Sequence, residues 1–200
     1  MQEERLQRQL ESHEVWLASG GEKGERLSLA GEELRGIDLS GRTLIEADLS
    51  EADLSEASLV RARLMGAHLA GTSLNGADLR GADLTKADLD RARLVKSSLQ
   101  EMRGVQVSLY GADLSDADLS AADLSFGYLM HVNLERAVLV GVCLYGAGVD
   151  MARLHGADLR GATGLEYVHI RSIDIGSKDS PDVLREEEAL GWLRQAAGGG

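Results

Sequence analysis

The chain has 200 residues, which suits one domain or two small ones. Only 4% of the residues are aromatic although 44% are hydrophobic, so Leu and Ala must supply most of the core. The net charge of −12 argues against direct binding to nucleic acid or an anionic membrane, because both need a basic face. A basic protein partner is compatible with this charge.

The N-terminal segment begins with polar and charged residues, Met1 to Arg5, and leads into no apolar run. No signal peptide is therefore expected. No stretch approaches the ~18 apolar residues of a membrane span, and Cys143 is the only cysteine, so no internal disulfide can form. A cytoplasmic protein is expected.

Residues 2–18 have the spacing of an amphipathic helix. Leu6, Leu10, His13 and Leu17 recur at three-to-four spacing, which places them on one stripe. Gly20 and its neighbour Gly21 end the pattern. We expect residues 1–21 to form a capping helix that covers the segment that follows.

A five-residue repeat dominates the chain. Leu recurs every five residues from Leu29 onward, at 25 of the 28 positions up to residue 164. A small residue, usually Ala, stands two positions before each Leu, and Asp often stands between them, so the unit is Ala-Asp-Leu-x-x. The three positions without Leu are Gly104, Val149 and Gly164.

A period of five fits neither regular element. On an α-helix five residues turn about 500°, so successive Leu side chains drift around the axis. On a flat strand an odd spacing sends them to alternate faces. Only a chain that turns a corner once per unit keeps every Leu inside, with Ala beside it. The spacing predicts a coiled solenoid and leaves three or four sides per coil open.

The repeated unit over residues 27–166 resembles the pentapeptide-repeat family. The resemblance implies an all-β solenoid, a right-handed quadrilateral β-helix of about seven coils, with short helices at both ends. We expect the β-helix to span residues 22–166. Gly104 leaves a gap in the Leu row that Met102 and Val107 can fill, and Glu32 and Arg42, at Ala positions of the first coil, should bend outward or be paired.

Residues 167–200 form a C-terminal extension. Ser180-Pro181-Asp182 is a typical helix start, so a helix is predicted over about 181–196. It would either cover the last coil or pack against a second copy; the family resemblance implies a homodimer through this end. Its apolar residues, candidates for cap or dimer contacts, are Val183, Leu184, Leu190 and Leu193.

Candidate chemistry is sparse. No two His or Cys residues have metal-ligand spacing, and no phosphate loop, dinucleotide motif or serine elbow is present. Stacked coils would place His68 between Asp48 and Asp88, which could orient an imidazole but is more typical of a surface ion pair. We expect no catalytic residue, cofactor or metal.

Two surface features are candidate partner-binding sites. The first is a row of carboxylates, Asp38, Asp78, Asp118 and Asp158, which should lie on one face. It resembles the family's fluoroquinolone-resistance members, acidic rods that bind DNA gyrase where DNA would lie. The alternative is that each Asp holds a turn. Basic residues on the middle coils depart from that likeness: Arg61, Arg63, Lys86, Arg91, Arg93 and Lys96.

The second feature is a group of outward aromatic and apolar residues in the later coils, which marks either an interaction site or a surface beneath the C-terminal helix. Its members are Tyr110, Phe126, Tyr128, Met130 and Tyr145. The sequence thus predicts a non-enzymatic protein-binding rod, in its most specific form a DNA mimic that binds DNA gyrase or topoisomerase IV and protects it from inhibitors. The alternative is a scaffold protein without a topoisomerase partner.

Overall fold

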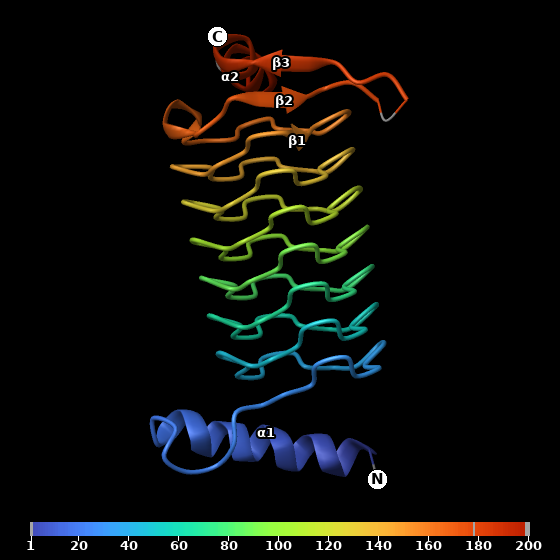
Figure 1. Ribbon diagram of the computed structural model, residues 1–200, viewed down its shortest axis with the longest axis vertical. Coiled ribbons are helices and arrows are strands. Elements are labelled where there is room, and N and C mark those ends of the chain that lie inside the picture. Colours follow the sequence, from blue (N-terminus) through green and yellow to red (C-terminus); the bar gives the residue numbers. More distant parts are fainter. Residues whose placement is uncertain (1, 178, 199–200) are drawn as a thin grey trace.

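The computed structural model describes residues 2–177 and 179–198, which form a rod of stacked coils closed at both ends (Figure 1). Met1, Lys178, Gly199 and Gly200, which belong to the two predicted terminal segments, lie outside the described residues. In this described part, no helix is long and apolar enough to cross a membrane. The elements are α1 (Gln2–Ala18), β1 (Ala152–Arg153), the 3-10 helix η1 (Leu165–Tyr167), β2 (Ser172–Asp174), β3 (Val183–Arg185) and α2 (Glu186–Ala196).

The coils pair through parallel bridges between residues 20 positions apart, from Ser28 with Asp48 to Cys143 with Thr163. Because the unit has five residues, each coil holds four units, which decides between the three-sided and four-sided alternatives. Residues 20 apart therefore stack in columns, and we name each face after one residue of its central column. The Tyr128 face contains Asp48, His68, Asp88, Ser108, Tyr128 and Gly148; the Arg93 face contains Glu33, Asp53, Ser73, Arg93, Asp113, Asn133 and Arg153; the Asp118 face contains Asp38, Ser58, Asp78, Ser98, Asp118, Val138 and Asp158; the Cys143 face contains Thr43, Arg63, Asp83, Arg103, Asp123, Cys143 and Thr163.

The predicted Leu and Ala positions form one continuous core. Polar substitutes at the Ala position are tolerated because their hydroxyls are satisfied: Thr72 Oγ1 donates to the carbonyl of Leu49 at 2.8 Å. The gap at Gly104 is filled as expected, since a Cβ there would lie 3.1 Å from both the Met102 Cε and the Val107 Cγ1.

Each corner of the rod is a residue with positive φ, two positions after the inward Leu. Twelve of these corners are Gly, which adopts this backbone without strain, but others are not: in one corner column φ is 66° at Gly41 and 57° at Ala121. A long corner side chain lies over the Gly of the next coil. A Cβ on Gly71 would meet the Glu51 Cγ at 3.5 Å.

Helix α1 covers the first coil and agrees with the predicted range (Figure 1). The first coil has no preceding coil to pair with, and His13 Nδ1 accepts the N–H of Leu27 at 3.1 Å in its place. The two charged residues at Ala positions are paired as expected: Arg5 Nη2 lies 3.3 Å from the Glu32 Oε1, and Arg42 donates to Gln7 at 3.4 Å.

The C-terminal end departs from the repeat by one residue. Gly164 adopts φ 75° and begins η1, so Leu165 takes the buried place that Gly164 would have had. Pairing then continues 21 rather than 20 positions apart, with Ile173 of β2 opposite Ala152 of β1. Strand β3 pairs antiparallel with β2 and places Leu184 opposite Ile173.

The predicted helix start at Ser180-Pro181-Asp182 is wrong. The Asp174 carboxylate accepts the N–H groups of Gly176 and Asp182, which holds this segment as a connection into β3. Pairing with the open edge of β2 overrides the local helix signal. Helix α2 starts at Glu186 instead, where three consecutive glutamates favour the positive helix end.

Helix α2 folds back on the last coil. Leu193 is buried, and so is Ala189, which the sequence analysis missed. The N–H of Gly161 donates to the carbonyl of Ala197 at 2.9 Å. Of the other predicted contacts, Leu190 and Leu184 are half-buried and Val183 is exposed; Val183 and Leu184 lie in β3 rather than in the helix.

Candidate partner-binding surfaces

The outward aromatic residues gather around one side of the last coils. We call this group the aromatic surface. Tyr110 and Met130 lie beside the Tyr128 face, and Phe126 occupies the corner that precedes it. Its large exposed members are Tyr110, Phe126, Tyr128, Tyr145, Met151 and Tyr167, each 40–54% exposed.

Four rings of the aromatic surface, those of Tyr110, Phe126, Tyr145 and Tyr167, contact another ring. Phe126 and Tyr145 lie edge to face with centroids 5.4 Å apart, and Tyr145 and Tyr167 are 4.6 Å apart. Tyr110 contacts His131 at 5.3 Å. Tyr167 was missed because the one-residue shift after Gly164 takes it out of the repeat register. Contacts between rings hold these side chains in place although they are exposed.

Glycines leave room for three residues of the aromatic surface. A Cβ on Gly146 would lie 2.7 Å from the Phe126 Cδ1, and one on Gly148 would lie 3.2 Å from the Met130 Sδ. Gly164 touches the backbone of Tyr145, where an added Cβ would come within 2.5 Å of the nitrogen. The shape of the aromatic surface therefore depends on these three positions.

An open groove borders the aromatic surface. Its walls combine the apolar side chains of Met130, Val168 and Ile170 with the charged residues Asp150 and Arg171. The Asp150 carboxylate accepts the N–H of the residue after Arg171 at 2.8 Å, which fixes its orientation. Helix α2 packs on the end of the rod (Figure 1) and contacts η1, which contains Tyr167, so the helix borders the aromatic surface at its C-terminal end.

The row of carboxylates shares the Asp118 face, as predicted. The turn interpretation is also correct, since Asp38, Asp78, Asp118 and Asp158 each accept the N–H two residues on. The pKa of Asp38 lies below its usual value because of hydrogen bonds from Ser40. For Asp118, partial burial raises the pKa, but hydrogen bonds from Ser120 and Gln100 lower it overall.

Two of these four carboxylates carry their own counter-charge, which the sequence analysis missed. Arg80 donates two hydrogen bonds to the Asp78 carboxylate, from Nε at 2.8 Å and from Nη2 at 2.6 Å, and Arg160 binds Asp158 through the same two atoms. These Arg contacts lower the pKa of both carboxyls. The sequence Asp-Leu-Arg at residues 78–80 and 158–160 is the signal from which these two ion pairs could have been predicted. The negative field of this face is therefore weaker than its Asp count suggests.

The His68 column is not a catalytic arrangement. Asp48 and Asp88 pair with His68 through the backbone on either side, but their carboxylates accept corner N–H groups. The lowered pKa of Asp48 arises first from the hydroxyl of Ser50, with His68 a smaller contribution. Within the described residues, no side-chain hydrogen bond joins the His68 ring to either carboxylate.

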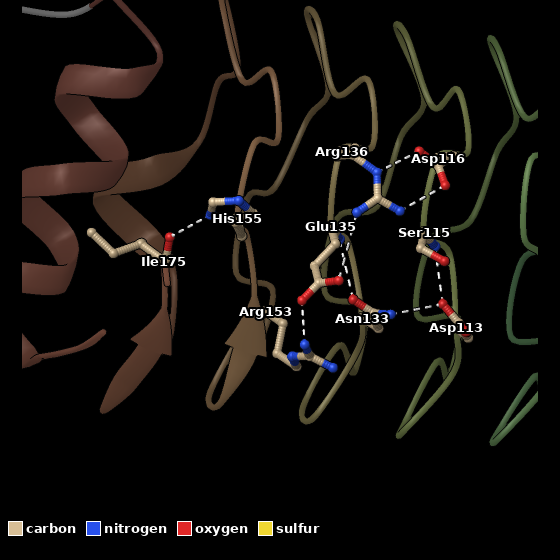
Figure 2. Close-up of polar contacts among 9 residues, drawn as sticks. All are labelled: Asp113, Ser115, Asp116, Asn133, Glu135, Arg136, Arg153, His155 and Ile175. Carbon is tan, nitrogen blue, oxygen red and sulfur yellow. Dashed lines mark hydrogen bonds and ion pairs between the residues drawn. The ribbon is translucent and has the colours of Figure 1, made fainter. Parts of the chain in front are cut away.

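A polar ladder follows the last coils of the Arg93 face (Figure 2). Asn133 donates to Asp113 at 2.9 Å, and the nearly buried Glu135 is paired with Arg153 of the next coil. At the adjacent corner Arg136 binds Asp116 through two bonds of 2.7 and 2.8 Å. Because every member has a partner, this ladder joins coils rather than offering free groups to a ligand.

Four-sided coils paired every 20 residues, closed by a helix at each end, define a β-helix solenoid. A family model described as "Pentapeptide repeats" matches residues 33–69, 62–100, 105–136 and 112–147 in eight copies. The chain belongs to the pentapeptide-repeat family.

Two solved structures resemble the rod. Both are trypsin-treated variants of QnrB1, a plasmid-mediated fluoroquinolone resistance protein, at 16% identity. One covers 86% of this chain and 96% of its own with a TM-score of 0.64; the other covers 87% and 98% with a TM-score of 0.51. At this identity the likeness concerns the fold alone. No curated protein sequence matches the chain.

Proposed function

We propose that this protein acts without catalysis, cofactor or metal, by binding a type II topoisomerase, DNA gyrase or topoisomerase IV, in the cytoplasm. The observation that carries the binding role is the aromatic surface. A cluster of exposed rings, several of which pack on one another, is typical of a protein interface. No such cluster is needed to hold the coils together, because the core is complete without it.

The choice of a topoisomerase as the partner rests on charge and on the likeness to QnrB1. The rod is acidic overall, and QnrB1, whose structure it resembles, is a fluoroquinolone resistance protein. The proposal also includes right-handed winding of the coils, which the family resemblance implies. An acidic rod of this kind would take the place of DNA on the enzyme and protect it from inhibitors. Because Arg80 and Arg160 neutralise half of the carboxylate row, we place the main contact on the aromatic surface.

A supercoiling assay tests the partner. Purified DNA gyrase is assayed with rising amounts of the protein at matched salt, with and without a quinolone. The proposal predicts lower supercoiling by the enzyme alone and less quinolone-trapped cleavage. No effect on either reaction at micromolar protein would reject the topoisomerase partner and leave the alternative, a scaffold protein that binds something else.

Matched variants locate the contact. In Phe126→Gly/Tyr128→Ser the rings are replaced by residues that the neighbouring coils already carry in the same columns, Gly146 and Ser108, so the fold should persist. This variant should lose the effect on gyrase. The control, Asp38→Asn/Asp118→Asn, keeps the rings and removes two charges. If the control loses the effect and the ring variant keeps it, the acidic row is the contact instead.

We also propose a homodimer through the C-terminal end. Val183 is 49% exposed on β3, the outermost strand of its sheet, so a charge there should prevent end-to-end association without disturbing the fold. Sedimentation of Val183→Glu beside the unchanged chain tests this. Equal oligomeric states would show that this strand is not the interface.

A further inference from the structure

Three neighbouring coils give the Arg93 face an acidic row, a neutral row and a basic row of side chains. Each row is one coil, read across the face and its two corners, and each charged column changes from negative to neutral to positive over three coils. The acidic row is Glu51, Asp53 and Glu56; the neutral row is Gly71, Ser73, Asn75 and Gly76; the basic row is Arg91, Arg93 and Lys96.

The charged rows are open to a partner. Arg91, Arg93 and Lys96 are exposed, and among the described residues no carboxylate lies within ion-pair distance of them. In the acidic row Asp53 accepts the N–H of Ser55, and among the described residues the row's one ion pair is between Glu56 and Arg35 at 2.7 Å, with both side chains 61% exposed. Such an exposed pair is easily exchanged for another.

The neutral row has only short side chains of its own. Its corners are Gly71 and Gly76, which have no side chain. Asn75 lies along the face, where its amide donates to Ser73 at 3.1 Å and its Oδ1 accepts the N–H of Val95 at 3.1 Å. The stems of Glu51 and Glu56 lie over Gly71 and Gly76, so a second surface would meet these two glutamates at the level of the neutral row as well.

This pattern is complementary to itself. A two-fold axis that crosses the face at the level of Ser73, at right angles to the rod, sends the acidic row onto the basic row. Glu51 then faces Arg91 of the second copy, Asp53 faces Arg93, and Glu56 faces Lys96; each pair occurs twice, as in any isologous contact. One row further out Arg35 faces Ser115 and Glu33 faces Asp113, so this outer level brings like charges together and opposes the contact.

The other faces lack this property at the same level. On the Tyr128 face Asp48 would meet Asp88, and on the Cys143 face Arg63 would meet Arg103. On the Asp118 face Asp78 would meet its own copy. Like charges placed opposite one another oppose association, so the Arg93 face alone suits an antiparallel pair centred on this coil.

We propose that the Arg93 face binds a second copy of the chain, antiparallel and side by side. This association is separate from the C-terminal homodimer and from topoisomerase binding. It depends on exposed ion pairs, so it is a transient contact that forms at low ionic strength and dissociates as salt shortens the screening length from about 10 Å at 0.1 M to about 3 Å at 1 M.

Charge exchange gives the decisive test. One variant, Glu51→Arg/Glu56→Lys, has two rows that are mostly basic; the other, Arg91→Glu/Lys96→Glu, has two that are mostly acidic. Each alone should sediment as a monomer at low salt in a Val183→Glu background, and an equimolar mixture should form a heterodimer that salt dissociates. A mixture that stays monomeric, or a single variant that associates like the parent, overturns the proposal.

A cross-link reports the geometry. In a Cys143→Ser background, Ser73→Cys places a thiol at the two-fold axis, where it faces its own copy, whereas Ser98→Cys places one at an equivalent half-buried position on the Asp118 face. Under mild oxidation the Ser73→Cys chain should form disulfide dimers at least several-fold faster. Equal rates, or a faster Ser98→Cys chain, would overturn the antiparallel arrangement. The same result is expected if the Arg93 face binds a different protein, so that case also overturns the proposal.

Discussion

The aspartate that precedes each inward Leu holds the corner that follows it. Its Oδ1 accepts the N–H two residues later, as between Asp53 and Ser55 at 2.9 Å and between Asp123 and Ser125 at 3.0 Å. Asn133 makes the same bond at 3.2 Å, so the bond depends on an acceptor rather than on a charge, and the corners after Arg93, Tyr128 and Val138 form without it. The consensus Asp is thus explained by local structure, and function has to be sought in residues that depart from the consensus.

Acid should weaken the rod through these carboxylates. Their folded pKa values lie below the unfolded value, so the folded state binds fewer protons. The stabilisation is complete above the unfolded pKa of about 4 and is lost as pH falls through the lower folded values. In Asp118→Asn the corner bond remains while the titrating group is gone. Urea unfolding between pH 3 and pH 7 (about one unit per step) should show a shallower pH dependence for this variant, and an unchanged slope would contradict it.

Corner glycines and corner alanines should have opposite effects on stability. In one corner column Gly41 and Ala121 both adopt positive φ, and a Cβ on Gly41 would meet nothing within 4 Å. Only backbone strain distinguishes the two substitutions. We expect Gly41→Ala to lower the free energy of unfolding by about 1 kcal/mol and Ala121→Gly to raise it by about 0.5–1 kcal/mol. Chemical denaturation measures both, and two changes of the same sign would refute this account of the corners.

At the scale of elements, α1 takes over the pairing that a preceding coil would provide. His13 is fully buried between the helix and the first coil, accepts the N–H of Leu27, and stacks on Trp16 with ring centroids 5.7 Å apart. Burial lowers the pKa of His13 and the backbone of Ile45 raises it; the charge of Arg26 lowers it further, while Glu14 and Glu46 oppose this. The helix is therefore bound through a neutral imidazole.

Acid should release α1 before the coils unfold. Because the folded pKa of His13 lies below its usual 6.5, the stability that depends on the neutral ring is present above that value and is lost as pH falls through the folded pKa. Trp16 fluorescence in a Trp192→Phe background should show a transition below pH 6.5, at higher pH than loss of the β-helix signal. His13→Leu should abolish the transition and weaken docking by about 1–3 kcal/mol, because the Leu27 N–H loses its acceptor. A transition that persists in this variant would assign it to another group.

The two ends differ in how well the sequence predicted them. The stripe of α1 was predicted within a residue or so because Leu10 and His13 recur at helical spacing and meet an end that needs covering. The C-terminal helix start was misplaced because the Ser-Pro-Asp signal is local, whereas β3 forms by pairing with a strand edge that only the folded chain presents. Tyr167 and the groove beside Met130 were missed for a related reason, since both arise from the one-residue shift at Gly164.

At the scale of the whole molecule, charge is distributed in zones along the rod. Residues 22–60 carry a net charge of −6, residues 61–105 carry +3, and residues 106–166 carry −5. The coil architecture and the shared columns followed from the five-residue spacing, and so did the outward aromatic residues. The charge zones and the self-complementary rows could be recognised only once the 20-residue coil was known, because the residues of one column are far apart in the sequence.

Removing one whole coil should leave the remaining coils intact. Excision of residues 66–85 joins Met65 to Lys86 with the five-residue register unchanged, and it brings the Glu46, Glu51 and Glu56 corners next to Lys86, Arg91 and Lys96. The shorter chain should fold cooperatively with the same circular dichroism signature, since each coil contacts only its neighbours. Excision of residues 66–84 shifts every later Leu by one place and should prevent folding. Equal behaviour of the two chains would refute the register argument.

Because the one-residue shift lies at Gly164, after the repeats, the number of coils and the structure that ends the rod are independent of each other. Nothing in a stack of identical coils ends the stack. Here it ends because the register shifts by one residue, once, after the last repeat. Duplication of any 20-residue stretch upstream would move the two end structures apart by about 4.8 Å without altering either. The length of the rod can therefore change in steps of one coil while both end structures stay the same.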